Sequence, residues 1–231
     1  MHRQQATSHK HLKDQNQHKL QSLKEQQEQL KPQALHLQQA NRSKKHSLLT
    51  VEECRLSFGS GAPISFSLSQ GERCYLTGAN GCGKSTLLKA IHGQHSNYTG
   101  SIKRLGATVY LDQHFSLLDT NDTMFDSLMI HSFGLTESDA RTLLAGIGFR
   151  RNSVYRKVAH LSGGEKMKLA MLIVSHKQGS PLLLLDEPDN HLDIDSKQIL
   201  ASALREYRGA FILVSHDVDF VEEVGFSQNR I

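Results

Sequence analysis

The sequence predicts an α/β fold with a mostly parallel central sheet. Three apolar segments of strand length end in polar residues, at 107–113, 182–187 and 210–217. The second contains four consecutive leucines, which is typical of a strand buried on both faces. A strand, a glycine-rich loop and a helix also follow one another over residues 71–92. Strands that alternate with helices in this way favour a parallel sheet covered by helices.

The bulk composition bounds the class of protein. The chain has 231 residues, which is enough for one large domain with a buried core. No apolar run approaches the length of a membrane span, and the N-terminus has no apolar signal region. We therefore expect a cytoplasmic protein without direct membrane insertion. The three cysteines have no C-x-x-C spacing, so the sequence predicts neither a disulfide framework nor a zinc site.

Positive charge is concentrated at the start of the chain. Residues 1–47 carry nine Lys and Arg against three Asp and Glu, a net charge of +6, whereas residues 48–231 carry eighteen against twenty, a net charge of −2. We divide the chain here into a basic Gln/Lys-rich helical arm or linker, 1–47, and a folded domain, 48–231. Within the arm, helically spaced leucines predict an exposed basic helix over residues about 6–30. A basic arm before a near-neutral domain indicates an anionic partner, typically nucleic acid. A solvated tail is the alternative interpretation of the arm.

Several short segments of the domain outside the three apolar strands are also strand candidates. Residues 47–53, 64–69 and 100–104 are strand candidates, and the second alternates apolar and polar side chains as a half-buried antiparallel strand does. Phe58 lies in the turn between the first two. An aromatic side chain at such a place fits either base stacking or ordinary packing in the core, and the residues alone leave this open.

Residues 78–86 have the full G-x-x-x-x-G-K-S form of a phosphate loop, between a strand and a helix. The glycines let successive backbone N–H groups point inward, and the helix start adds a positive dipole end. Lys84 is expected to reach the β- and γ-phosphates and Ser85 to bind Mg²⁺. The candidate phosphate-binding residues are Gly78, Asn80, Gly81, Gly83, Lys84, Ser85 and Thr86.

The middle of the chain predicts helices. Residues 122–148 carry helically spaced apolar side chains, and Thr136 with Asp139 is a plausible helix start. Residues 161–165 form a small-residue loop before a helix expected over 166–176. Because a helix N-terminus attracts anions, this loop is a second anion-binding candidate.

Carboxylates and a histidine follow the last two apolar strands. Asp186 at the strand end is placed to hold Mg²⁺, and Glu187 to orient a water for attack on a γ-phosphate. His216 fits either a contact to the γ-phosphate or a structural strand-end role. Ligands of such sheets bind beyond the carboxyl ends of the strands, where all of these residues fall.

Together these motifs resemble an ATP-binding-cassette (ABC) ATPase over residues 48–231. Residues 78–86 are similar to the first Walker motif, 161–165 to the family signature, and 182–187 to the second Walker motif with its catalytic glutamate. The resemblance implies a P-loop NTPase fold of ABC ATPase type, with a mostly parallel core sheet, an antiparallel β subdomain and a small helical subdomain over about 114–162. It also implies ATP and Mg²⁺ as ligands.

The resemblance assigns roles residue by residue. It implies catalytic roles for Glu187, for His216 as the switch histidine, and for Gln113 of the Q-loop. Phe58 takes the place of the adenine-stacking aromatic. Three residues would hold the metal, namely Ser85, Gln113 and Asp186. In this family the signature of one cassette meets the ATP of another, which implies a second cassette as partner, in a longer protein or a homodimer. The signature residues are Ser162, Gly163, Gly164 and Glu165.

Residues 186–193, D-E-P-D-N-H-L-D, resemble the D-E-P-T-N-H-L-D motif of one subfamily of these ATPases, ABC-F. Glu165 agrees with this subfamily, whereas Asp189 stands where Thr is usual and Lys168 where Arg is common. ABC-F proteins have no membrane domain, carry two cassettes joined by a basic helical hairpin, and act on ribosomes. The resemblance implies that residues 1–47 are the end of that hairpin. Because only one cassette is present and family members usually continue beyond Ile231 with a further strand and helix, we expect a fragment or a truncated reading frame.

Three functional interpretations follow from the sequence. The first is a translation-associated ATPase that binds ribosomal RNA through the basic arm. The second is the ATP-binding subunit of a membrane transporter, which would need a docking groove within residues 114–160 and would leave the arm without a role. The third is a nucleotide-binding remnant without turnover.

Overall fold

The computed structural model describes residues 36–40, 47–57, 61–132, 134–177 and 179–226. The prediction of a helix near residues 6–30 lies outside the described residues, as does the prediction for Phe58.

The larger sheet has five strands in the order β1-β4-β8-β7-β6. The pairs β4–β8, β8–β7 and β7–β6 are parallel, and Leu184 of β7 pairs with Ile212 on one side and Tyr110 on the other. The predicted, mostly parallel sheet is therefore confirmed. Its strands are β1 (His36–Ala40), β4 (Arg73–Thr77), β6 (Thr108–Asp112), β7 (Leu182–Asp186) and β8 (Phe211–Val214).

Strand β1 is an addition that the sequence did not predict. Its backbone pairs antiparallel with β4, from His36 opposite Thr77 to Ala40 opposite Arg73. The sheet therefore begins before residue 48, within the segment assigned above to the arm. The run His-Leu-Gln-Gln-Ala has little strand propensity, so only pairing to the edge of β4 defines this strand.

A second, three-stranded antiparallel sheet has the order β3-β2-β5, as the sequence predicted for this region. Its strands are β2 (Ser47–Leu56), β3 (Ile64–Ser69) and β5 (Tyr98–Arg104). The central strand β2 is bulged, and its Glu53 has a φ of 49°. Gly100 of the neighbouring strand β5 lies directly against β2 at this bulge. A Cβ atom on Gly100 would lie 2.4 Å from the Glu53 carbonyl oxygen. Only glycine fits that close approach.

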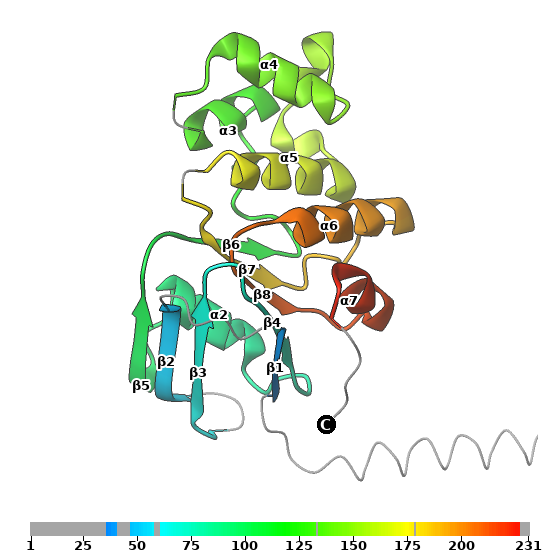
Figure 1. The fold of residues 1–231 in the computed structure, drawn as a ribbon. Helices are drawn as coiled ribbons and strands as arrows, with labels where there is room; N and C mark the ends of the chain where they lie inside the picture. Colours follow the sequence, from blue (N-terminus) through cyan, green and yellow to red (C-terminus); the bar gives the residue numbers. More distant parts are fainter. Residues whose placement is uncertain (1–35, 41–46, 58–60, 133, 178, 227–231) are drawn as a thin grey trace, which may run out of the picture. The chain divides into compact units, whose positions relative to one another are not determined.

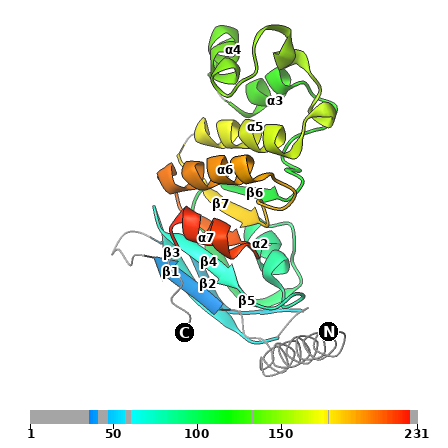
Figure 2. The same ribbon diagram turned by 90° about the vertical axis from the view of Figure 1, so that its right-hand side faces the viewer.

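The leucines of β7 pack alternately into two hydrophobic cores, one on each face of the sheet. Leu183 and Leu185 join the cluster on the helical face of the sheet, with α3, α5, α6 and α7. Leu182 and Leu184 point the other way, toward α2 (Lys84–His92) and the antiparallel sheet. Figures 1 and 2 show the same layers, with α5, α6 and α7 on one face of the larger sheet and α2 on the other. A strand covered on both faces explains the uninterrupted leucine run.

Between β6 and β7 the described chain is helical. The predicted helical stretch 122–148 forms two helices, whose N-cap residues are Thr123 and Thr136. The signature helix begins at Gly163, three residues before the predicted Lys166, because Ser162 caps it. The elements are α3 (Met124–His131), α4 (Glu137–Gly146), η1 (Arg151–Tyr155), η2 (Val158–His160) and α5 (Gly163–Ser175), followed after β7 by α6 (Ile194–Glu206) and after β8 by α7 (Val218–Val224). Within the described ranges no helix is both long and apolar enough to cross a membrane.

Candidate functional site

The glycine-rich loop joins β4 to α2 as predicted. Gly81 and Gly83 have φ values of 76° and 104°, in the left-handed region that favours glycine. Lys84, the first residue of α2, is only 7% exposed. Its ammonium donates hydrogen bonds to the carbonyls of Gly78 at 2.6 Å and Ala79 at 3.1 Å. The loop therefore folds around its own lysine, which positions a fixed positive charge at the helix N-terminus.

Ser85 and Asp186 meet although 101 positions separate them in the sequence. The Ser85 hydroxyl donates to Asp186 Oδ1 at 2.9 Å. The other carboxylate oxygen accepts a hydrogen bond from the Tyr110 hydroxyl at 2.5 Å. Burial, and then this bond to Asp186, raises the pKa of Tyr110, so the phenol stays a donor. A hydroxyl and a carboxylate placed side by side are the oxygen ligands that Mg²⁺ prefers, so this pair fits the predicted metal.

Glu187 lies beyond the end of β7 in an unusual backbone conformation. Its φ is 53°, uncommon for a residue with a Cβ, and its N–H donates to the Val214 carbonyl at 2.9 Å. One carboxylate oxygen lies 3.3 Å from His216 Nε2, and the other accepts from Asn190 Nδ2 at 2.5 Å. The backbone strain and two side-chain contacts hold this carboxylate in one direction, as a water-orienting base requires.

A cavity of about 350 Å³ gathers most of the predicted residues. Glu187 and His216 face the phosphate loop across it. Gln113 does not line the cavity, but its Oε1 lies 3.5 Å from the Asn190 amide that also contacts Glu187. Asp186 does not line the cavity either, but it accepts a hydrogen bond from Ser85, which does. The lining residues are Asn80, Gly81, Gly83, Lys84, Ser85, Thr86, Glu187 and His216.

The signature residues lie apart from this cavity, and none of them lines it. Ser162 and Glu165 form a capping box at the start of α5, and Arg156 pairs with Glu165 at 2.9 Å. Burial tends to raise the pKa of Glu165, but hydrogen bonds from Arg156 and Ser162 outweigh it and lower the pKa. Gly164 packs so closely that a Cβ atom would lie 2.3 Å from the Ser196 hydroxyl. These contacts hold the N-terminus of α5 in place outside the cavity.

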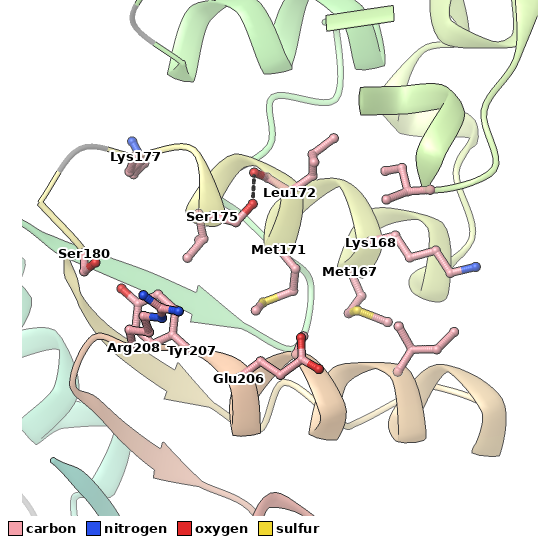
Figure 3. A pocket seen from close by; sticks show the side chains of 14 residues that line it. Met167, Lys168, Met171, Leu172, Ser175, Lys177, Ser180, Glu206, Tyr207 and Arg208 are labelled. Carbon is pink, nitrogen blue, oxygen red and sulfur yellow. Dashed lines mark hydrogen bonds between the residues drawn. The ribbon is translucent and has the colours of Figure 1, made fainter. Parts of the chain in front are cut away.

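A larger hollow of about 500 Å³ lies between α5 and α6 and contains none of the predicted site residues (Figure 3). Met167 and Met171 of α5 point toward α6 in this view, and Lys168 points outward at the rim. The smaller cavity at the phosphate loop is the better candidate, because charged groups converge there whereas apolar side chains dominate the larger hollow.

Comparison with known proteins gives the family. The family model described as "ABC transporter" matches residues 62–190, more than half of the chain. The chain belongs to this family. Two Arabidopsis thaliana proteins, "ABC transporter F family member 5" and "ABC transporter F family member 2", are 39% identical over 165 residues and 37% identical over 188 residues. The matches cover 69% and 77% of this chain. They confirm an ATPase cassette of the ABC-F type.

The chain covers only part of these proteins, 24% and 27% of their lengths. A solved structure titled "Structure of a bacterial Atm1-family ABC exporter with ATP bound" has a TM-score of 0.60 at 20% identity, covering 79% of this chain and 36% of that one. At this identity the likeness concerns the fold alone, and it confirms the predicted ABC ATPase fold.

Two residues of the site were missed by sequence reasoning. Asn190 contacts Glu187 and lies near Gln113, and Tyr110 anchors Asp186. Asn190 stands inside the run 186–193, but its position in that run does not reveal which side chain it contacts. Tyr110 faces Asp186 only because β6 and β7 pair in parallel with Asp112 opposite Asp186.

Asp189, the departure from the subfamily run, is a buried carboxyl two residues after Glu187. It is only 2% exposed, and its Oδ1 has no hydrogen-bond partner among the described residues. Burial raises its pKa, although a hydrogen bond from Ser215 opposes the shift. A carboxyl with a raised pKa favours folding most while protonated, and this stability is lost as the pH rises through the raised value.

Asp189→Asn should therefore stabilise the fold at pH 7, because the amide keeps the shape and removes the buried charge. We expect the free energy of unfolding to rise by about 1–3 kcal/mol. Urea unfolding at pH 7 and pH 4.5 measures the effect, which should shrink at the lower pH. Glu222→Gln, which neutralises an exposed carboxylate of α7, is the control and should change little. An Asp189→Asn chain no more stable than wild type at pH 7 would contradict this prediction.

Proposed function

We propose that the chain is an ATP-binding and ATP-hydrolysing cassette that works with a second cassette and acts on the ribosome. The observation that supports the hydrolytic part most strongly is the cavity in which Lys84, Ser85, Glu187 and His216 converge. A lysine for phosphate, a hydroxyl for metal, a held carboxylate and a histidine are the groups that phosphoryl transfer to water requires.

Each group has a distinct proposed task. Lys84 binds the β- and γ-phosphates, exchanging its loop carbonyls for phosphate oxygens. Glu187 orients the attacking water, and Asn190 and His216 keep its carboxylate in place. Ser85 and Asp186, with Gln113 nearby, would hold Mg²⁺, which when bound would neutralise charge on the phosphate oxygens. If Phe58 stacks on the adenine, it completes the site.

The second cassette follows from the position of the signature. Ser162 is exposed and Gly164 is half-buried at the start of α5, and neither lines the cavity of their own chain. We propose that they complete the ATP site of an opposite cassette, either in a longer protein or in a second copy. A 13-residue helix with a capped N-terminus offers its dipole end to the γ-phosphate there.

The ribosomal part rests on charge and on family. The net charge of +6 in residues 1–47 suits an RNA backbone, and the relatives are named as members of the F family. The alternative function, an ATP-binding subunit of a membrane transporter, gives this charge no role. Co-sedimentation with ribosomes distinguishes the two functions. We further propose that the protein acts in the cytoplasm.

The test is co-sedimentation of the Glu187→Gln chain with ribosomes, with and without ATP, across a salt series. We expect retention that needs ATP and weakens steeply with salt, because phosphate contacts release counterions. Substituting Gln for Lys10, Lys13, Lys19 and Lys24 together should weaken retention and flatten its salt dependence. Absence of pelleting at every salt concentration would contradict the ribosomal proposal and leave ATP binding unaffected.

A further inference from the structure

The charge of the folded domain is unevenly distributed. Residues 141–164 contain five Lys and Arg and no Asp or Glu, whereas the rest of residues 48–231 contains thirteen against twenty. The segment therefore carries +5 on a domain that is otherwise −7. A basic segment on an acidic background is the electrostatic footprint of an anionic ligand.

The structure places four of these five cations on one short exposed turn, namely Arg150, Arg151, Arg156 and Lys157. They lie around η1 and η2, between α4 and α5, at the end of the domain that carries α3 and α4 (Figure 1). Arg150, Arg151 and Lys157 are exposed, and none of the three forms a salt bridge within the described part of the chain. Arg156, by contrast, is paired with Glu165, and Arg141 on α4 is paired with Glu137. A 3₁₀ turn of this length spans about 10 Å, so the free cations stand within reach of neighbouring phosphates of one strand.

An exposed aromatic ring stands in the same turn. Tyr155 is 47% exposed, and its ring packs at a tilt against Phe125 with centroids 5.7 Å apart. Arg141 donates to the Tyr155 hydroxyl at 2.9 Å, and its guanidinium lies 5.7 Å from the centre of the Phe125 ring. These contacts hold Tyr155 in one orientation while leaving much of it in solvent. A fixed, exposed aromatic ring beside free cations suits base stacking with phosphate contacts.

We propose that this turn, Arg150–Lys157 with Tyr155 at its centre, is a binding site for single-stranded RNA. Arg150, Arg151 and Lys157 would contact backbone phosphates, and a base would stack on Tyr155. The site deepens the proposed ribosomal function by adding an RNA contact on the cassette, separate from the basic arm and from the ATP cavity. An acidic protein segment would also match the cations, but it has no base to place on the tyrosine ring.

The experiment measures binding of a fluorescently labelled single-stranded U12 RNA to the full chain by anisotropy, without ATP, between 50 and 300 mM KCl. Arg150→Gln/Arg151→Gln should weaken binding and lower the slope of log K against log salt by about 1.4, since each contact to a single strand contributes about 0.7. Tyr155→Ala should weaken binding about 5-fold or more, as loss of one stacked base does. Tyr155→Phe keeps the ring and should bind like wild type, which separates loss of stacking from loss of structure.

The control is Lys89→Gln/Lys103→Gln, which removes the same charge from exposed positions on α2 and β5. The proposal is overturned if Arg150→Gln/Arg151→Gln matches this control in affinity and slope. It is also overturned if poly-glutamate competes as well as unlabelled U12, because the site would then bind any polyanion. Neither result affects the ATP-dependent co-sedimentation, so failure of this site and failure of the ribosomal function are distinguishable.

Discussion

Glu187→Gln is expected to lower ATP turnover by roughly 10²- to 10⁴-fold, the usual contribution of a positioned general base. The amide has the same shape, so its contacts with Asn190 and His216 can persist while the negative charge that polarises water is lost. ATP affinity should change little. Phosphate release is measured at rising chain concentration, because the proposed site takes Ser162 and Gly164 from a second cassette.

Glu222→Gln on α7 is the matched control, since it makes the same chemical change at an exposed position that does not line the cavity. It should release phosphate at the wild-type rate. Equal turnover by Glu187→Gln and wild type would remove Glu187 from the catalytic role and leave the binding site untouched.

Lys84→Ala is expected to abolish most nucleotide binding. The buried ammonium is the cavity's fixed cation, and loss of a desolvated charge contact costs about 2–5 kcal/mol, which is roughly 30-fold to several thousand-fold in Kd. Fluorescence titration with a labelled ATP analogue measures the change. Circular dichroism checks that the loop variant still folds, because Lys84 also holds the Gly78 and Ala79 carbonyls.

Lys89→Ala provides the comparison on the same helix. Lys89 is exposed in the last turn of α2, five residues beyond Lys84, so its truncation removes the same charge without touching the cavity. Wild-type affinity is expected for Lys89→Ala. A Lys84→Ala chain that binds ATP as tightly as Lys89→Ala would contradict the phosphate-loop interpretation.

The parts of the site that sequence could predict are those that local chemistry determines. The left-handed φ values of Gly81 and Gly83 are available to few residues other than glycine, so the loop is visible in the sequence. The leucines of β7 reveal a strand buried on both faces, and polar residues at its end mark the ligand edge. The small-residue loop 161–165 predicts a helix after it, but its glycines hid that the helix already begins at Gly163, capped by Ser162.

The parts that sequence could not predict depend on tertiary pairing. Tyr110 contacts Asp186 across two strands whose register no local pattern defines. Strand β1 exists only as a partner of the β4 edge. The unpartnered oxygen of Asp189 becomes visible only once its burial is known. Such features can be recognised only in the folded structure, because they depend on contacts between residues that are far apart in the sequence.

The most direct measurement is calorimetric titration of the Glu187→Gln chain with ATP and with AMP in the presence of Mg²⁺. The convergence of Lys84, Ser85 and Asp186 predicts that ATP binds at a single site. It also predicts that AMP, which lacks the β- and γ-phosphates, binds at least about 30-fold more weakly. Binding of AMP as tight as that of ATP, or no binding of ATP at all, would show that this cavity is not a nucleotide phosphate site.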